Sequence, residues 1–242
     1  MTISQLKAYE GNCIIEKGEQ FSYADLVQKI EDYQNKLSSE IEKGDVICIK
    51  SDYSFKSIAI FLALMELPCI IVPIVPTTDS EMESKLKASL VNKIISFNNE
   101  EIQIETITET LELPKNYSEI TDKNQSGLVL FSSGTTGEPK VMVHNLTELA
   151  ESFAQPKKTR NLNFLLFLMF DHIGGINTLL NCLNNGSAIT LPENRNPAYI
   201  LDLIQTQKVQ ILPTSPTFLN LMLMNENFAD YIDGFMTGAV KY

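Results

Sequence analysis

Two hydrophobic patterns alternate along the chain. From Leu26 onward apolar residues recur every three or four positions, which predicts an amphipathic helix. Ser22 and Asp25 precede this stripe with the spacing of a capping box, so the helix is expected to begin at Ser22. In contrast, 69–72 is a short, fully apolar run closed by Pro73, and this pattern predicts a buried strand.

Repetition of these patterns predicts strands and helices in turn. Strands are expected at 13–15, 45–49, 69–72, 93–96, 102–105, 126–132, 141–145, 163–169, 188–191 and 209–212. Helices are expected at 22–41, 54–65, 80–90, 147–155, 173–183, 198–206 and 215–224. Because most of these strands are apolar throughout, the pattern predicts an α/β fold with parallel β-sheets flanked by helices.

The alternation weakens in one segment, 98–125, which is polar, acid-rich and poorly patterned. A segment of this kind is typical of a solvated connection between structural units. We therefore expect two α/β subdomains, 1–125 with the acidic junction at its end and 126–242, the second incomplete at its C-terminal end.

Residues 131–140 (FSSGTTGEPK) carry the clearest chemical signal. Gly134 and Gly137 permit a tight turn with positive φ, in which successive backbone N–H groups form an anion-binding concavity. Hydroxyl and ammonium groups add hydrogen-bond donors and positive charge, from Ser132, Ser133, Thr135, Thr136 and Lys140. The spacing differs from a Walker A loop, but the composition predicts a loop that binds the outer phosphates of a nucleotide.

The flanks of this loop indicate its setting. Apolar, β-prone segments lie on both sides, at 127–131 and 141–144. Pro139 disfavours a helix through the lysine. The loop is therefore expected to join strand to strand, without the N-terminus of a helix behind the phosphates.

Composition limits the classes of function. The 242 residues carry a net charge of −11, which disfavours nucleic acid as a partner because nucleic-acid binding needs basic patches. Four scattered cysteines are typical of reduced thiols in a cytoplasmic protein, and two histidines leave no ligand set for a metal site of the zinc type. The longest apolar stretch, 58–76, contains Glu66 and prolines, so we expect a buried helix and strand there and no membrane span. The N-terminus lacks the features of a signal peptide.

The segment SSGTTGEPKV resembles the phosphate-loop signature of the adenylate-forming (AMP-binding) enzymes, which include acyl-CoA synthetases, luciferases and the adenylation domains of peptide synthetases. Other segments are similar to that family and occur in its order: FSYADL at 21–26, the helix-then-strand segment at 54–76, FDHIGG at 170–175 and VQILPTSP at 209–216. The resemblance covers nearly the whole chain. It implies the N-terminal part of such an enzyme, without the C-terminal lid domain.

The resemblance also implies an activity and a set of site residues. An acid–CoA ligase of this kind lets a carboxylate attack the α-phosphate of ATP, which gives an acyl-adenylate and pyrophosphate, with CoA as the expected acceptor. The loop residues that would hold the β- and γ-phosphates are Ser132, Ser133, Gly134, Thr135, Thr136 and Gly137. Lys140 would offset the phosphate charge and His172 would lie beside the substrate carboxylate, and both are the expected catalytic residues. Gly174 and Gly175 would leave room for the acid, and Mg²⁺ is an expected cofactor whose glutamate ligand lies beyond this chain.

Two residues of the FDHIGG segment leave alternatives open. Amino-acid-activating relatives carry an aspartate in a context similar to that of Asp171, where it pairs with the α-amino group of the substrate. The His-x-Gly-Gly pattern, however, resembles the aryl- and fatty-acid-activating branches, and we favour an acyl or aryl acid. A second interpretation of His172 is a helix cap without ligand contact. His144 is expected to be structural.

The chain ends at Tyr242, in a segment that resembles the strand and turn before the Y-G-x-T-E motif of the family. In the family most of the adenine pocket, the ribose-binding aspartate and the lysine of the C-terminal domain follow that point. We therefore expect this chain to be inactive alone. One hypothesis is that it forms part of a longer or split ligase, completed by a C-terminal half or in a homo-oligomer. The other is a short non-catalytic module that binds a nucleotide or an acyl group.

Overall fold

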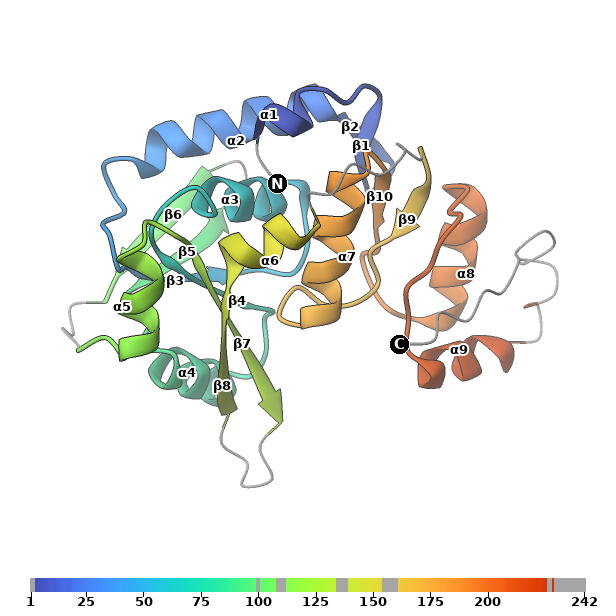
Figure 1. Ribbon diagram of the computed structural model, residues 1–242. Coiled ribbons are helices and arrows are strands. Elements are labelled where there is room, and N and C mark those ends of the chain that lie inside the picture. The colour runs from blue at the N-terminus through green and yellow to red at the C-terminus, as the bar shows by residue number, and fades with distance from the viewer. Residues whose placement is uncertain are drawn as a thin grey trace.

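The computed structural model describes residues 3–98, 101–107, 112–133, 139–153, 161–225 and 228. The strands of this part form two sheets (Figure 1). The six-stranded sheet has the order β6-β5-β3-β4-β7-β8 and is built from β3 (Val46–Lys50), β4 (Ile70–Ile74), β5 (Lys93–Asn98), β6 (Glu101–Thr106), β7 (Gly127–Ser133) and β8 (Pro139–Asn145). The four-stranded sheet has the order β2-β1-β10-β9 and is built from β1 (Asn12–Glu16), β2 (Glu19–Ser22), β9 (Asn163–Leu165) and β10 (Ala188–Leu191).

Both sheets are parallel in their centres; the larger has an antiparallel strand at each edge and the smaller has one at a single edge. In the larger sheet β5, β3, β4 and β7 are parallel neighbours, whereas β6 and β8 pair antiparallel at the two edges. In the smaller sheet β1, β10 and β9 are parallel and β2 is antiparallel. The prediction of an α/β fold with sheets flanked by helices is confirmed.

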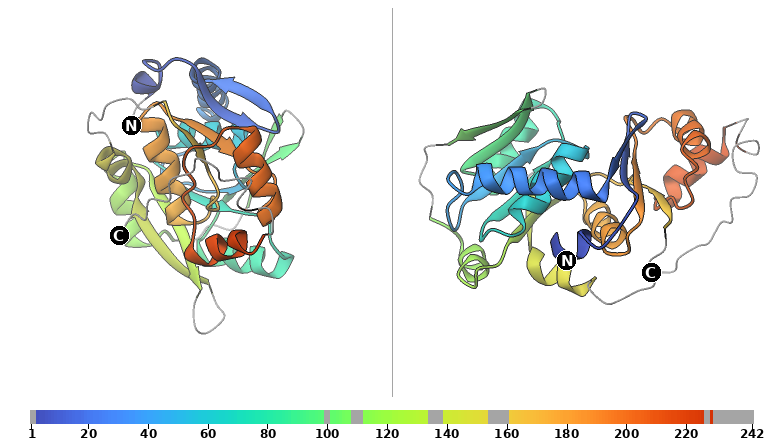
Figure 2. Two further views of the ribbon diagram at one scale, coloured as in Figure 1. Left: turned by 90° about the vertical axis from the view of Figure 1, so that its right-hand side faces the viewer. Right: turned by 90° about the horizontal axis from the view of Figure 1, so that it is seen from above.

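Helices cover the sheets in layers. Those of the first half are α1 (Ile3–Leu6), α2 (Tyr23–Leu37), α3 (Phe55–Leu64), α4 (Asp79–Ala88) and α5 (Lys115–Thr121). Those of the second half are α6 (Leu146–Ser152), α7 (Ile173–Asn184), α8 (Pro197–Thr206) and α9 (Pro216–Leu223). Figure 1 shows α2, α3 and α6 on one side of the larger sheet, with α4 and α5 on the other. In Figure 2, left, α8 and α9 lie over the outer face of the smaller sheet.

Three hydrophobic clusters lie between these layers. The largest joins α2, α3 and α7 to the facing sides of both sheets. The second packs α4 and α5 against the outer face of the larger sheet, and the third packs α8 and α9 against β9. Alternate residues of strand β3 face opposite sides of the sheet, so the strand contributes to two clusters. Ile47 and Ile49 belong to the first cluster, and Val46 and Cys48 belong to the second.

Several local predictions need correction. Pro73 lies inside β4 and does not end it; β4 pairs with β7 only at Ile70 and Ile71, so the missing N–H of Pro73 falls where that ladder has already ended. The strand expected at 163–169 stops at Leu165. At 209–212 the described part shows a single parallel bridge, between Phe164 and Ile211. Strand β2 and helices α1 and α5 were not predicted.

Each sheet takes strands from both sides of residue 125. Strands β7 and β8 follow it in sequence but belong to the larger sheet with β3 and β4. Strands β1 and β2 precede it but belong to the smaller sheet with β9 and β10. A parallel pairing between distant segments leaves no local sequence signal, so the order of strands along the chain does not reveal which sheet each one joins.

All four cysteines (Cys13, Cys48, Cys69 and Cys182) are buried free thiols. Burial raises the pKa of the Cys48 thiol to about 12. Among the described helices, none has the length and apolar character needed to cross a bilayer.

Candidate nucleotide and acid site

The predicted phosphate loop lies between the ends of two antiparallel strands. The β7–β8 ladder runs to Ser133 opposite Pro139, and the preceding pair is Ser132 opposite Lys140. This part of the ladder places a hydroxyl and an ammonium group on neighbouring strands at the base of the loop. Ser132 is half-buried and Lys140 is exposed. Gly134, Thr135, Thr136 and Gly137 lie outside the described residues.

His172 is the N-cap of α7. Its Nδ1 accepts a hydrogen bond from the Gly174 backbone N–H at 3.0 Å. This bond satisfies one of the free N–H groups at the start of the helix. The imidazole therefore has the capping role that was one of its two interpretations. A contact of the same ring with a substrate stays a prediction.

The two glycines after His172 differ in their surroundings. A Cβ on Gly175 would collide with the backbone carbonyl oxygen of Met169, and it would lie 2.9 Å from the Tyr53 hydroxyl. A Cβ on Gly174 would meet a movable group, the Leu168 side chain, at 2.8 Å. Gly175 is therefore needed for close packing of α7 against the preceding segment, a purpose that the sequence did not reveal. Room for a substrate at this position stays a prediction.

Asp171 forms an ion pair inside the protein. Its Oδ2 lies 3.6 Å from the Nζ of Lys85 on α4, and both side chains are largely buried. Burial raises the pKa of the Asp171 carboxyl above its ordinary value, while Lys85 and the backbone N–H groups of Asp171 and Val75 act in the opposite direction. Sequence reasoning did not single out Lys85. Its spacing of four residues from Glu81 was the one local signal, and the contact with Asp171 joins distant segments.

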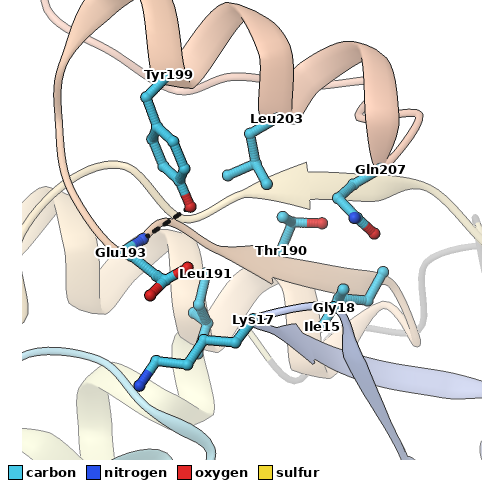
Figure 3. Close-up of a pocket in the computed structure, with 9 residues that line it drawn as sticks. All are labelled: Ile15, Lys17, Gly18, Thr190, Leu191, Glu193, Tyr199, Leu203 and Gln207. Carbon is cyan, nitrogen blue, oxygen red and sulfur yellow. Dashed lines mark hydrogen bonds between the residues drawn. The ribbon is translucent and has the colours of Figure 1, made fainter.

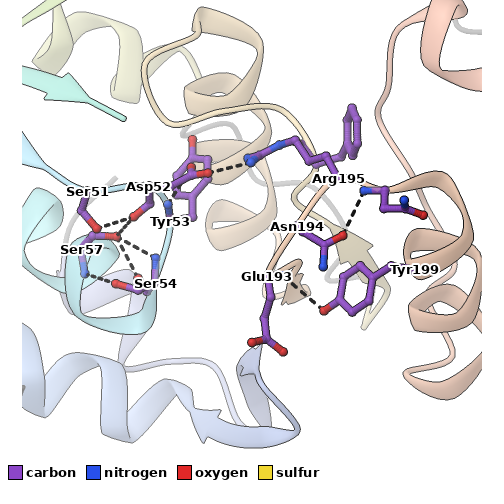
Figure 4. Close-up of polar contacts among 11 residues, drawn as sticks. Ser51, Asp52, Tyr53, Ser54, Ser57, Glu193, Asn194, Arg195 and Tyr199 are labelled. Atoms are coloured by element: carbon purple, nitrogen blue, oxygen red, sulfur yellow. Dashed lines mark hydrogen bonds and ion pairs between the residues drawn. The ribbon is translucent and has the colours of Figure 1, made fainter. Parts of the chain in front are cut away.

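A second, partly buried polar contact joins the two sheets (Figure 4). Arg195, in the loop after β10, reaches Asp52, in the turn after β3, with 2.8 Å between Nη1 and Oδ2. The neighbouring Tyr53 packs its ring on Phe170 at 4.6 Å between centroids. Among the described residues the Tyr53 hydroxyl has no hydrogen-bond partner, and burial keeps its pKa well above the ordinary value. These residues line the junction of the sheets beside Asp171.

A small cavity of about 170 Å³ lies elsewhere, between the β1–β2 turn, the end of β10 and α8 (Figure 3). Its lining residues are Ile15, Lys17, Gly18, Thr190, Leu191, Glu193, Tyr199, Leu203 and Gln207. None of the predicted site residues is among them. The Tyr199 hydroxyl accepts a hydrogen bond from the Glu193 backbone N–H at 3.3 Å.

The described residues contain no group of three or more His, Cys, Asp or Glu side chains that could hold a metal ion. His144, expected to be structural, lies on β8 opposite Leu128, and its Nε2 is buried without a hydrogen-bond partner in the described part.

Two β-sheets flanked by helices, a segment rich in Gly, Ser and Thr between β7 and β8, and a His-x-Gly-Gly sequence at the start of α7 characterise the chain. The chain belongs to the AMP-binding enzyme family, whose sequence pattern matches residues 5–237. It is similar to a 3,4-dihydroxybenzoate–[aryl-carrier protein] ligase of Bacillus anthracis, with 20% identity over 86% of this chain and 50% of the relative. It is also similar to 4-coumarate–CoA ligase 3 of Arabidopsis thaliana, with 27% identity over 79% of this chain and 40% of the relative.

Solved structures show the same fold. The N-terminal subdomain of Klebsiella oxytoca NpsA, in complex with 3-hydroxyanthranilyl-AMSN, superposes with a TM-score of 0.74 at 19% identity, over 93% of this chain and 60% of the other. The inhibitor-bound N-terminal domain of FACL13 from Mycobacterium tuberculosis gives a TM-score of 0.73 at 19% identity, over 93% of this chain and 64% of the other. The fold is that of the N-terminal domain of adenylate-forming enzymes. The chain spans half or less of the length of the two curated relatives above.

Proposed function

We propose that this chain supplies the nucleotide loop and the acid motif of an ATP-dependent ligase that activates a carboxylic acid. The observation that carries the proposal is the pairing of Ser132 with Lys140 at the base of the loop. ATP and a carboxylate are both anions, and two like charges 4 Å apart repel by about 4 kcal/mol at an effective dielectric constant of 20. A cation fixed by the strand ladder offsets part of this repulsion. The glycines and threonines of the loop itself, Gly134, Thr135, Thr136 and Gly137, would add donors to the phosphates.

His172 is proposed to orient the acid. Because its Nδ1 accepts the Gly174 N–H, the neutral ring carries its proton on Nε2. We propose that this N–H donates to the substrate carboxylate, while the cap to α7 holds the ring in place. The imidazole would then serve the fold through one nitrogen and the acid through the other.

For the acid we propose an acyl or aryl acid without an adjacent ammonium group. The carboxylate of Asp171 already faces the ammonium group of Lys85, so it is not left as a free anion for an amino-acid substrate. Two of the similar proteins, by their names, act on aromatic acids, 3,4-dihydroxybenzoate and 4-coumarate. CoA is the acceptor that we propose, with a carrier protein as the alternative.

The whole reaction would need more than these residues. We propose magnesium as the counter-ion of the nucleotide and assign it no ligand in this chain. A C-terminal polypeptide or a second copy of this chain would complete the site. We place the reaction in the cytoplasm, a setting in which the four free thiols would stay reduced.

Binding of Mg–ATP, measured by isothermal titration calorimetry, tests the proposal. A charge-assisted contact is worth about 1.5–3 kcal/mol, so Lys140→Ala should weaken binding by roughly 10- to 150-fold. Lys115→Ala is the matched control, since Lys115 is an exposed lysine on α5. Equal affinity of the wild type and Lys140→Ala, or no binding by the folded wild type, would overturn the proposal.

A further inference from the structure

Lys85 occupies an unusual position for a lysine. It lies near the end of α4, yet its side chain is only 12% exposed. Its ammonium group lies 2.8 Å from Glu81 Oε1 on the same helix and 3.6 Å from Asp171 Oδ2, which belongs to the segment before α7. A buried ammonium group needs such partners, because an unpaired charge in a protein interior is costly.

A third contact points toward the phosphate loop. The Lys85 ammonium lies 5.6 Å from the centre of the Phe131 ring, within the range of a cation–π interaction. Phe131 is in β7, directly before Ser132 and Ser133. Lys85 thus contacts the strand that leads into the predicted nucleotide loop on one side and the start of the predicted acid motif on the other.

Asp171 depends on this cation. Its charged form is favoured by Lys85 and by the backbone N–H groups of Asp171 and Val75, and it is disfavoured by burial and by the nearby carboxylate of Asp52. Charged and titratable groups face Asp171 from three sides. Helix α4 contributes Lys85, which is paired with Glu81. The turn before α3 contributes Asp52, which is paired with Arg195, and Tyr53, while His172 is the next residue in the chain. Among these groups Lys85 is the cation in direct contact with the carboxylate.

We propose that Lys85 is a positioning residue that couples the nucleotide loop to the acid motif. The proposal rests on the proposed function, because it takes ATP as the ligand of the loop. Phosphates bound beside Ser132 attract the Lys85 ammonium, and the electrostatic support that Lys85 gives to Asp171 decreases. The titration of the Asp171 carboxyl then changes when the nucleotide binds, although Asp171 does not contact the nucleotide. Such a link would keep acid and nucleotide in register, which matters when reacting atoms must approach to about 3–3.5 Å.

The test is a pH titration of the Asp171 carboxyl by ¹³C NMR, with the resonance assigned by its loss in Asp171→Asn. In the wild type, saturating Mg–ATP should raise the midpoint of this titration by about 0.3 or more, because an added anion shares the cation. Lys85→Met should raise the midpoint without ATP and abolish the response to ATP. Lys85→Arg should restore the response, since it keeps the charge.

Lys87→Met is the matched control, because Lys87 lies on the same helix and is exposed; it should behave as the wild type. A wild-type protein that binds ATP with no change at Asp171 would overturn the coupling and leave the proposed function intact. A shift of the Asp171 titration by ATP in Lys85→Met would likewise overturn the coupling and leave the proposed function intact. A folded wild-type protein that does not bind ATP would overturn both proposals. Absence of an ATP response at Asp171 in the wild type overturns the coupling even where a Lys85 variant fails to fold.

Discussion

The guanidinium group of Arg195 and the carboxylate of Asp52 lie 2.8 Å apart and join the two sheets (Figure 4). Arg195 follows a strand of the smaller sheet, and Asp52 follows a strand of the larger one. The Nε of Arg195 also donates to the Phe167 carbonyl oxygen at 2.8 Å. The two side chains are 28% and 29% exposed, so water and salt screen this pair less than a surface pair. The Arg195 side chain thus connects the two sheets at the ends of their strands.

Replacement of Arg195 by methionine should destabilise the fold. The variant loses the ion pair and the bond to Phe167, so we expect the free energy of unfolding to fall by about 1–3 kcal/mol in urea titrations. Glu119→Gln is a suitable control, because the Lys115–Glu119 pair is exposed and its loss should cost at most about 0.5 kcal/mol. A similar loss for both variants would show that the contact between the sheets has no special weight.

Alanine should be tolerated at Gly174 and not at Gly175. At Gly175 the added methyl group meets the Met169 carbonyl oxygen, which is backbone and cannot move aside, so we expect a loss of about 1–3 kcal/mol or an insoluble protein. At Gly174 it meets the end of the Leu168 side chain at 2.8 Å and the His172 ring at 3.2 Å, both side chains that can shift, and the gain in helix propensity of up to about 1 kcal/mol offsets the crowding. Thermal unfolding of the two variants compares them directly, and the reverse order would contradict the packing argument.

The capping box at the start of α2 should contribute a pH-dependent stability. Ser22 Oγ accepts the Asp25 N–H at 3.1 Å, and the Asp25 carboxylate accepts the Ser22 N–H at 2.7 Å. Hydrogen bonds from the Ser22 side chain and backbone lower the pKa of Asp25 below its ordinary value of 3.8. Because the pKa of Asp25 is lower in the folded protein, its carboxylate contributes its full stabilisation at pH values above the ordinary pKa of 3.8. This contribution to the free energy of unfolding is lost as the pH falls through the lowered pKa of the folded state.

Ser22→Ala should therefore cost about 1 kcal/mol at neutral pH and less in acid. Denaturant titrations of the wild type and the variant between pH 7 and about pH 3 measure the difference at each pH. A cost that stays constant down to the acid limit would show that Asp25 does not contribute through its charge.

The sequence was a good guide to the elements whose signal is local. The capping box predicted the start of α2, and the apolar, β-prone flanks of the phosphate loop predicted its place between two strands. It was a poor guide to contacts between distant segments. The pairing of β1 with β10, and of Lys85 with Asp171, depends on how the layers pack, and neither residue type nor spacing reports it. The same limit applies to Gly175, because a glycine required by a neighbouring carbonyl looks like a glycine required by a ligand.

A comparison of two substitutions separates the capping role of His172 from a role toward the acid. Asparagine is a favoured N-cap residue, so His172→Asn should keep the hydrogen bond to the Gly174 N–H and unfold at nearly the wild-type denaturant concentration. His172→Ala loses this acceptor and should cost about 1 kcal/mol. Both variants lose the imidazole N–H. If this group donates to the carboxyl oxygen of the substrate, both should bind benzoyl-sulfamoyl-adenosine, a mimic of an acyl-adenylate, about 10-fold more weakly or worse. Weak binding by a stable His172→Asn protein would assign the ring to the acid as well as to the helix. Wild-type affinity in His172→Asn would leave His172 with the cap alone.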